Sequence, residues 1–493
     1  MAEATGEQQQ LRKVLHWHDG FIVAMSIPGA LFAALGYTMG SVGAWGALAL
    51  WAFSSLIAVF MNWIYAELAA MFPDKPGGIA LYAHEGWRKH FSLIGPIATF
   101  GYWFAWSSVL AIFGTTIGYL VQAEWFPGAT RTFDVGAVDV GLPHLIGAGC
   151  VVLVWAINML GIKPAVWLGR VSTFLLLIPI GVFAIIVFLT GDWDSSLLQW
   201  NFTGPWGGWK LAIVWLYIIG WTAYGVEVAA SFAPEYRDTR RDTSLALKAA
   251  GLFTFGVFVL VPLGAGGTVS TEDAAANPIG FWVASFDQIV GGASDFMVVI
   301  LIGAFLLTMN AATADGGRAL YGIARDHMTI KQLYHLNHRG IPARAMTLDM
   351  IVNLALIFLI ASPLAILVAG NLGYMSVHFF AVTAFLLLRK DRPHWPRPIR
   401  RHPIFVPIAV VICALNAVFI AVGASSASLS GYGGKKELWI GIGVLLISVL
   451  LFVYRRAVQD RAPIRLREDA PATPDAVDGV DGVVVPAPGA AGR

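Results

Sequence analysis

The sequence predicts an all-α polytopic membrane protein with about 12 transmembrane helices. Of its 493 residues 57% are apolar and only 13% are charged, and the apolar residues gather in runs long enough to span a bilayer. Soluble domains carry roughly 25% charged residues, so this chain has too few to coat a globular surface. The runs are also too long, and alternate too little, for a transmembrane β-barrel. A soluble enzyme, a disordered chain and a fibrous protein are therefore excluded.

The expected spans follow one another along most of the chain. They are 20–38, 42–70, 94–121, 143–161, 166–191, 209–232, 245–265, 295–317, 345–361, 364–388, 404–424 and 437–454. Lys and Arg concentrate in every second loop, beginning with the loop after the second span. Because cytoplasmic loops carry the excess of Lys and Arg, we expect a plasma (inner) membrane protein with both termini cytoplasmic.

Polar segments flank the predicted transporter domain, which covers residues 20–456. Residues 1–19 form a polar cytoplasmic segment without a signal-peptide cleavage site. Residues 457–493 are rich in Asp, Pro, Ala and Gly, which predicts a disordered cytoplasmic tail.

Two spans contain residues that interrupt a helix in mid-membrane. Pro28 and Gly29 lie in the middle of the first span, and Gly220 and Gly225 lie in the sixth. Taken singly, these are a proline kink and packing glycines. Spans one and six are five apart, which favours a 5+5 inverted repeat with broken helices 1 and 6. The halves are about 20–191 and 209–388, and two extra helices occupy 404–454.

Broken helices offer backbone groups that suit an amino acid. Free N–H groups at Gly29, Ala30 and Leu31 would hold a carboxylate. Carbonyl groups of 25–27 and 220–223 would hold an ammonium group. Aromatic side chains such as Trp221 and Tyr224 would then close over the substrate.

Several motifs in order resemble the amino acid–polyamine–organocation (APC) superfamily of permeases. Glu67 lies in a Tyr-Ala-Glu-Leu segment that is followed by Phe-Pro and Gly77-Gly78. Gly225-Val226-Glu227 resembles the family's Gly-Phe-Glu, and Trp221 takes the place of the gating tryptophan of arginine/agmatine-type exchangers. The stretch from Asn310 to Asp326 resembles a further family pattern. The resemblance covers about residues 15–460 and implies alternating access around a midplane site.

The first-span motif departs from the family pattern. The family has Gly-Ser-Gly-Ile-Phe where this chain has Pro28-Gly29-Ala30-Leu31-Phe32, so a serine hydroxyl is missing. Some relatives carry a lysine in span five in place of a sodium ion, and the matching residue here is Pro179. The resemblance therefore supports no coupling through that lysine.

Ionisable residues inside spans are costly, so they usually have a partner or a function. We expect gating or coupling roles for Glu227, Asp315, Arg318 and Glu67. The structural alternatives are a hydrogen-bonded buried carboxyl for Glu227, an Asp315–Arg318 pair one turn apart, and a pair of Glu67 with a basic loop.

The predicted substrate site combines the two breaks with the third span. Its candidates are Ser26, Ile27, Pro28, Gly29, Ala30, Trp106, Ser107, Trp221, Thr222, Tyr224 and Gly225. A sodium site near Ala312 and Thr313 is permitted but not required. We expect no catalytic residue, no other metal, no cofactor and no nucleic acid.

Three functions compete at this stage. The first is a secondary active transporter, a permease or exchanger, that moves an amino acid with a coupled proton or sodium ion. The second is a transporter of a polyamine or alkanolamine, which lacks a carboxylate and would use Glu227 and the aromatic residues. A channel or membrane enzyme is the remote alternative, because no filter loop, nucleophile elbow or phosphate-binding loop is visible.

Overall fold

The computed structural model describes most of the chain. Description is limited to residues 13–469 without 14, 26, 74, 76, 136–137, 161–170, 172–173, 231, 338–339 and 361. Ser26 of the predicted site and the end of the predicted tail, 470–493, lie outside the described residues.

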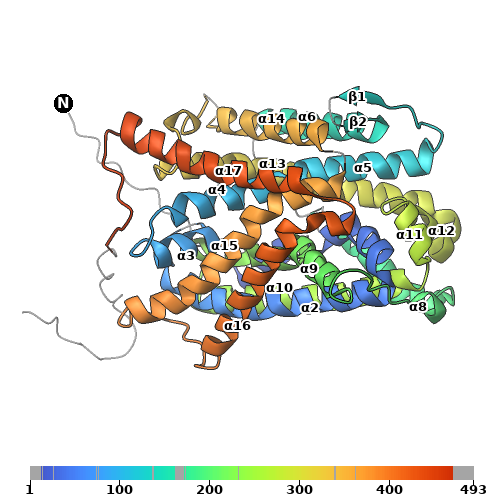
Figure 1. Cartoon of the computed structure of the whole chain (residues 1–493), viewed down its shortest axis with the longest axis horizontal. Coiled ribbons are helices and arrows are strands. Elements are labelled where there is room, and N and C mark those ends of the chain that lie inside the picture. The colour runs from blue at the N-terminus through green and yellow to red at the C-terminus, as the bar shows by residue number, and fades with distance from the viewer. Residues whose placement is uncertain are drawn as a thin grey trace, which may run out of the picture.

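Helices dominate the described part of the chain, as the composition predicts (Figure 1). The long ones are α2 (Leu35–Met71), α4 (Ile94–Ser107), α5 (Val109–Trp125), α6 (Leu142–Leu160), α9 (Trp209–Tyr224), α10 (Thr239–Gly266), α13 (Ser294–Arg325), α14 (Ala343–Leu359), α15 (Pro363–Asp391), α16 (Phe405–Val418) and α17 (Lys435–Tyr454). The short α-helices are α1 (Trp17–Ala24), α3 (Gly78–Trp87), α8 (Val187–Thr190), α11 (Thr271–Ala276) and α12 (Phe281–Val290).

Tighter and wider helical turns interrupt these helices at several points. The 3₁₀ segments are η1 (Ile27–Ala33), η3 (Ser195–Leu197), η4 (Gly225–Ala230), η5 (Ala233–Glu235), η6 (Gly291–Ala293), η7 (Lys331–Leu333) and η9 (Ala427–Ser430). The π segments are η2 (Val182–Ile186), η8 (Phe419–Ala424) and η10 (Arg455–Gln459). One antiparallel hairpin, β1 (Phe133–Val135) with β2 (Val138–Val140), completes the described secondary structure.

The prediction of a polytopic helical membrane protein is confirmed. Within the described residues nine helical stretches are long and apolar enough to cross a membrane. The three other expected spans are not continuous helices of 18 or more described residues. The first span is divided between α1 and η1. The fifth span is described as a helix only over residues 174–190. The ninth span is α14, which has 17 residues. Gly43, with φ +75°, marks the corner between two spans inside α2.

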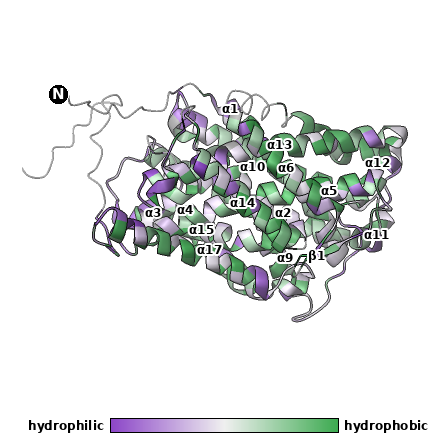
Figure 2. Ribbon diagram, turned by 90° about the horizontal axis from the view of Figure 1, so that it is seen from above, coloured by the Kyte–Doolittle hydropathy of each residue, from purple (hydrophilic) through white to green (hydrophobic). Residues whose placement is uncertain are grey.

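The bundle has two chemically different ends. Hydrophilic residues gather at the end that holds α3, and hydrophobic residues dominate the long helices (Figure 2). We call this end the basic end, because Arg389, Arg392 and Arg401 form their ion pairs and hydrogen bonds there. The opposite end carries the short helices α11 and α12 (Figure 2). Trp282 of α12 donates from Nε1 to Phe32 O at 2.8 Å and so packs this segment against η1.

The chain near the basic end is ordered further than the sequence predicts. Part of the expected tail crosses the end of the bundle and pairs with the loop between α3 and α4. Leu466 O accepts from Ser92 N at 2.9 Å, and Glu468 N donates to Arg88 O at 2.8 Å. Composition alone did not reveal these contacts, because the partners lie more than 370 residues away in sequence.

Candidate functional site

The two interrupted helices meet at Gly225. A Cβ at this position would lie 2.7 Å from Ile27 Cγ2 and 3.8 Å from the Trp106 ring, so only glycine permits this approach without a shift. Both partners belong to the predicted site: Ile27 begins η1 and Gly225 begins η4. The 3₁₀ segments therefore start where the sequence predicts the breaks, and they contact each other there.

Gly29 and Pro28 lie inside this junction. Both are buried, and a Cβ on Gly29 would lie 2.7 Å from the Leu176 methyl groups. Ala30 is also buried. Gly29 is the third residue of η1, which begins at Ile27.

Aromatic side chains surround the junction. Trp221 is 7% exposed and donates from Nε1 to Ala105 O at 3.2 Å, which fixes its ring beside α4. The Trp106 ring lies 6.1 Å from Tyr102 and 6.4 Å from Tyr374, measured between centroids. Its indole N–H is buried and has no hydrogen-bond partner among the described residues. The junction therefore combines an aromatic wall with a buried polar donor that faces Glu227.

Glu227 lies directly behind these rings. Its side chain is fully buried, and its Oε1 accepts hydrogen bonds from Tyr374 at 3.0 Å and Tyr102 at 3.2 Å. Its Oε2 has no partner among the described residues. The hydroxyl groups stabilise one oxygen of the carboxyl group and leave the other available, which suits a group that binds a cation or a proton.

Two predicted site residues, Ser107 and Tyr224, bond to residues outside the junction, and a third, Thr222, has no partner in the part of the chain that the structure describes. The Ser107 hydroxyl accepts from Asn353 Nδ2 at 2.9 Å, on the side of α14. Tyr224 donates to Asn416 Oδ1 at 3.2 Å, and its ring lies 5.1 Å from His378. Thr222 is fully buried, and its hydroxyl has no partner among the described residues. These residues support the walls of the junction.

The gating candidates divide into two groups. Glu67 is fully buried at the basic end and accepts from Arg389 at 3.0 and 2.6 Å and from Arg401 N at 2.7 Å. The expected pair of Glu67 with a basic loop is thus present, and a gating role stays a prediction. Asp315 and Arg318 lie one turn apart on α13, and both are exposed.

The sodium site also stays a prediction. Thr313 is buried, and its hydroxyl donates to Met309 O at 2.9 Å within α13. Across the described ranges, no group of three or more His, Cys, Asp or Glu residues is arranged to hold a metal ion.

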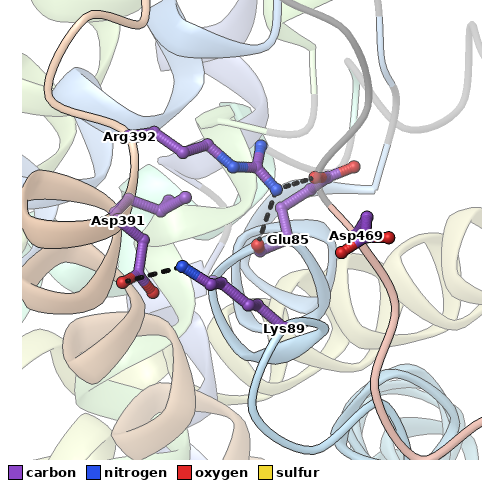
Figure 3. A pocket seen from close by; sticks show the side chains of 7 residues that line it. Glu85, Lys89, Asp391, Arg392 and Asp469 are labelled. Atoms are coloured by element: carbon purple, nitrogen blue, oxygen red, sulfur yellow. Dashed lines mark hydrogen bonds and ion pairs between the residues drawn. The ribbon is translucent and has the colours of Figure 1, made fainter.

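A second charged cluster surrounds Glu85 at the basic end. Glu85 accepts from Lys75 at 2.8 Å and from Arg392 at 2.9 Å. Burial raises the pKa of this carboxyl, but its hydrogen bonds and charge interactions with Lys75 and Arg392 outweigh burial and lower it. A cavity of about 230 Å³ adjoins the cluster, and Figure 3 shows Lys89 beside Asp391 across it. The cluster connects α3 to the end of α15.

Three residues that the structure places near Glu227 or on α14 were not identified from the sequence. Tyr102 and Tyr374 bind Glu227, and Asp349 lies buried on α14. Asp349 had a usable signal, because it is an acid inside the predicted span 345–361. Tyr374 had none, since nothing in a span shows which side chain will reach a residue on another helix.

Comparison with known proteins identifies the family. The family model described as amino acid permease matches residues 17–453. The chain belongs to the amino acid permease family. It is 27% identical over 394 residues to a putative arginine/ornithine antiporter of Escherichia coli (strain K12), covering 76% of this chain and 81% of that protein.

Other relatives are transporters as well. The amino-acid permease RocE of Bacillus subtilis (strain 168) is 24% identical over 355 residues, covering 70% of this chain and 72% of that protein. The cadaverine/lysine antiporter of Escherichia coli (strain K12) is 25% identical over 350 residues, covering 69% of this chain and 73% of that protein. The prediction of a multi-pass amino acid transporter of the APC superfamily is confirmed, and the amine-only alternative is not favoured.

Proposed function

We propose that this amino acid permease family member is a secondary active transporter, and not an enzyme, that moves its substrate across the plasma membrane by alternating access. The observation that carries the proposal is the contact of η1 with η4 at Gly225. Non-helical backbone at membrane depth is tolerated only where it is buried in protein or lines a cavity, and paired helix breaks of this kind mark the substrate site of transporters. The proposed halves are 20–191 and 209–388.

The backbone at this junction defines the proposed substrate contacts. The N–H group of Gly29 in the first turn of η1 binds the substrate carboxylate. Carbonyl groups at the end of α9, in residues 220–223, bind the α-ammonium group. The sequence also suggested the N–H groups of Ala30 and Leu31, which follow Gly29 in η1.

A cationic amino acid fits this site best. Glu227 keeps Oε2 without a partner among the described residues, and the rings of Trp106 and Tyr374 lie beside it. A carboxylate with aromatic neighbours attracts an ammonium or guanidinium group. The names of the relatives agree, since two of them exchange arginine for ornithine or cadaverine for lysine.

The proposed orientation places the basic end in the cytoplasm. Arg389 lies in the last turn of α15, and Arg392, Arg397 and Arg401 follow that helix at this end. Cytoplasmic loops carry such an excess of arginine. Both termini are then cytoplasmic.

Counterflow into proteoliposomes tests the function. We expect arginine, lysine or ornithine inside the vesicles to drive uptake of the labelled amino acid, and agmatine or cadaverine, which lack a carboxylate, to drive it less. If only the amines support counterflow or raise the melting temperature of the purified protein, the proposed carboxylate site is wrong.

A pair of glycine variants tests the junction. Gly225→Ala places a methyl group against Ile27 and should abolish counterflow, whereas Gly256→Ala in α10 meets open space and should preserve it. Full counterflow by Gly225→Ala would contradict the proposed junction.

A further inference from the structure

Asp349 is a buried acid that the proposed substrate site does not use. It lies in the second turn of α14 and is fully buried. The backbone of α13 comes close to its carboxyl group, because a Cβ on Gly316 would lie 3.1 Å from Oδ2. The next residue, Gly317, makes the same close approach to Met346 of α14. Two consecutive glycines thus let α13 cover the acid.

This carboxyl group has no cationic partner among the described residues. The polar groups that face its two oxygens are neutral. They are the Ser107 hydroxyl and the Trp103 indole of α4. An unpaired carboxylate in such a place costs several kcal/mol, so the acid carries a proton in this conformation.

The charged groups on the adjacent helices do not neutralise Asp349. From α13, Asp315 acts on Asp349 with the same sign of charge, and Arg318 acts on Asp315. Other ionisable residues belong to elements packed against α14, but none of them bonds to Asp349 within the described residues. They are Asp295, Tyr321 and Arg325 of α13, Tyr119 and Glu124 of α5, His144 and Cys150 of α6, Asp139 of β2 and Lys331 of η7.

Asp315 connects this buried acid to water. It precedes Gly316 on α13 and is exposed, and an acid in a spanning helix is exposed to water and not to lipid because of the cost of burial in hydrocarbon. A proton can therefore leave Asp349 when its O–H bond breaks, bind a carboxylate oxygen of Asp315, and pass to solvent. No other reactant is needed.

Asp349 is also connected to the substrate site. Asn353, one turn further along α14, donates to Ser107 at 2.9 Å and to Asp349 O at 2.9 Å. It also accepts from Ala111 N at 3.1 Å. Ser107 follows Trp106, which lies against Gly225. A change of charge at Asp349 therefore acts on the junction between α4 and α5, next to the proposed substrate.

We propose that Asp349 is the proton-binding residue that couples transport to proton movement, with Asp315 as its relay to water. This inference rests on the proposed transport function and goes beyond it, because it names the coupling ion and its site. Protonated Asp349 permits substrate movement, and its deprotonation through Asp315 completes the cycle.

Full-length protein in proteoliposomes tests the proposal with Asp349→Asn and a matched control, Asp326→Asn, at the exposed end of α13. Wild type and Asp326→Asn should accumulate substrate about tenfold per unit of imposed pH gradient for one coupled proton. Asp349→Asn, which resembles the protonated acid, should keep counterflow but lose this accumulation. Accumulation by Asp349→Asn that equals wild type, or wild-type counterflow without any proton-driven accumulation, would overturn the proposal.

An infrared measurement separates this inference from the transport function and does not depend on uptake. The carbonyl stretch of a protonated carboxylic acid should be present in wild type and Asp326→Asn and reduced in Asp349→Asn, at equal melting temperatures. No difference in this band means that Asp349 is not protonated and overturns the proposal alone. Absence of wild-type counterflow for every amino acid would instead overturn the transport function.

Discussion

Buried carboxyl groups occur in two regions of this protein, and their surroundings are opposite. At the basic end, Glu67 and Glu85 are surrounded by arginine and lysine donors. In the middle of the bundle, tyrosine hydroxyls donate to Glu227, and the polar groups that face the two oxygens of Asp349 are neutral. A buried pair with an arginine keeps its charge in every state, whereas an acid without a cation can gain or lose a proton. From this comparison we propose a structural role for the carboxyl groups of the first region and proton or substrate binding for those of the second.

The largest expected effect comes from removing an acid from the basic end. Glu67→Ala leaves Arg389 and Arg401 without their partner, so we expect a loss of about 3–5 kcal/mol in stability. Thermal unfolding of the purified protein measures it, with the exposed Glu272→Ala of α11 as control. If Glu67→Ala melts at the same temperature as Glu272→Ala, the ion pairs of Glu67 do not stabilise the protein, and the contrast between the two regions is wrong.

The next effect concerns the aromatic wall of the junction. Trp221→Ala removes a buried ring and its bond to Ala105 O, so substrate affinity should fall by tenfold or more, or about 1.4 kcal/mol. The control is Trp209→Ala, at the exposed start of the same helix. The dissociation constant can be measured by titration calorimetry. Unchanged affinity and transport rate in Trp221→Ala would show that the substrate site lies elsewhere.

A smaller effect on stability, but a specific effect on transport, is expected at Glu227. Glu227→Gln keeps an oxygen that accepts from Tyr102 and Tyr374, so stability should change by less than about 1 kcal/mol. Because the glutamine cannot titrate, the pH dependence of counterflow should flatten. Tyr102→Phe keeps the acid but removes one of its donors, so counterflow should stay pH-dependent in this variant. A pH profile equal to wild type in Glu227→Gln would place this acid with the structural ones.

The smallest effect is expected at Glu85. Its pKa in the folded protein is lowered, so its contribution to stability is present above the unfolded value of about 4.3 and is lost as pH falls through the folded pKa. Glu85→Gln should therefore lower the melting temperature at neutral pH and reduce its further decrease under acid. Equal acid sensitivity in wild type and the variant would mean that Lys75 and Arg392 do not stabilise the charged form.

Local signals in the sequence predicted the helix breaks of the substrate site, but they did not predict the contacts between distant helices around it. Pro28, Gly29 and Gly225 predicted the breaks, because their backbone chemistry acts within one helix. Glu67 predicted a pair with a basic loop, because the loop charges are visible in the sequence. The hydrogen bonds of Glu227 to Tyr374, across 147 residues, could not be predicted, and the same holds for the burial of Asp349 against Gly316.

The sequence by itself determined that this protein is a multi-pass helical membrane protein with two interrupted helices. Hydropathy, helix interruption and loop charge are properties of single segments, so they need no knowledge of neighbours. Only the tertiary structure decided which acids are paired with arginine and which are left with neutral neighbours, and that the chain up to Glu468 binds the basic end. Those outcomes depend on which helices pack together, since the cost of a buried charge is set by groups that come from distant parts of the chain.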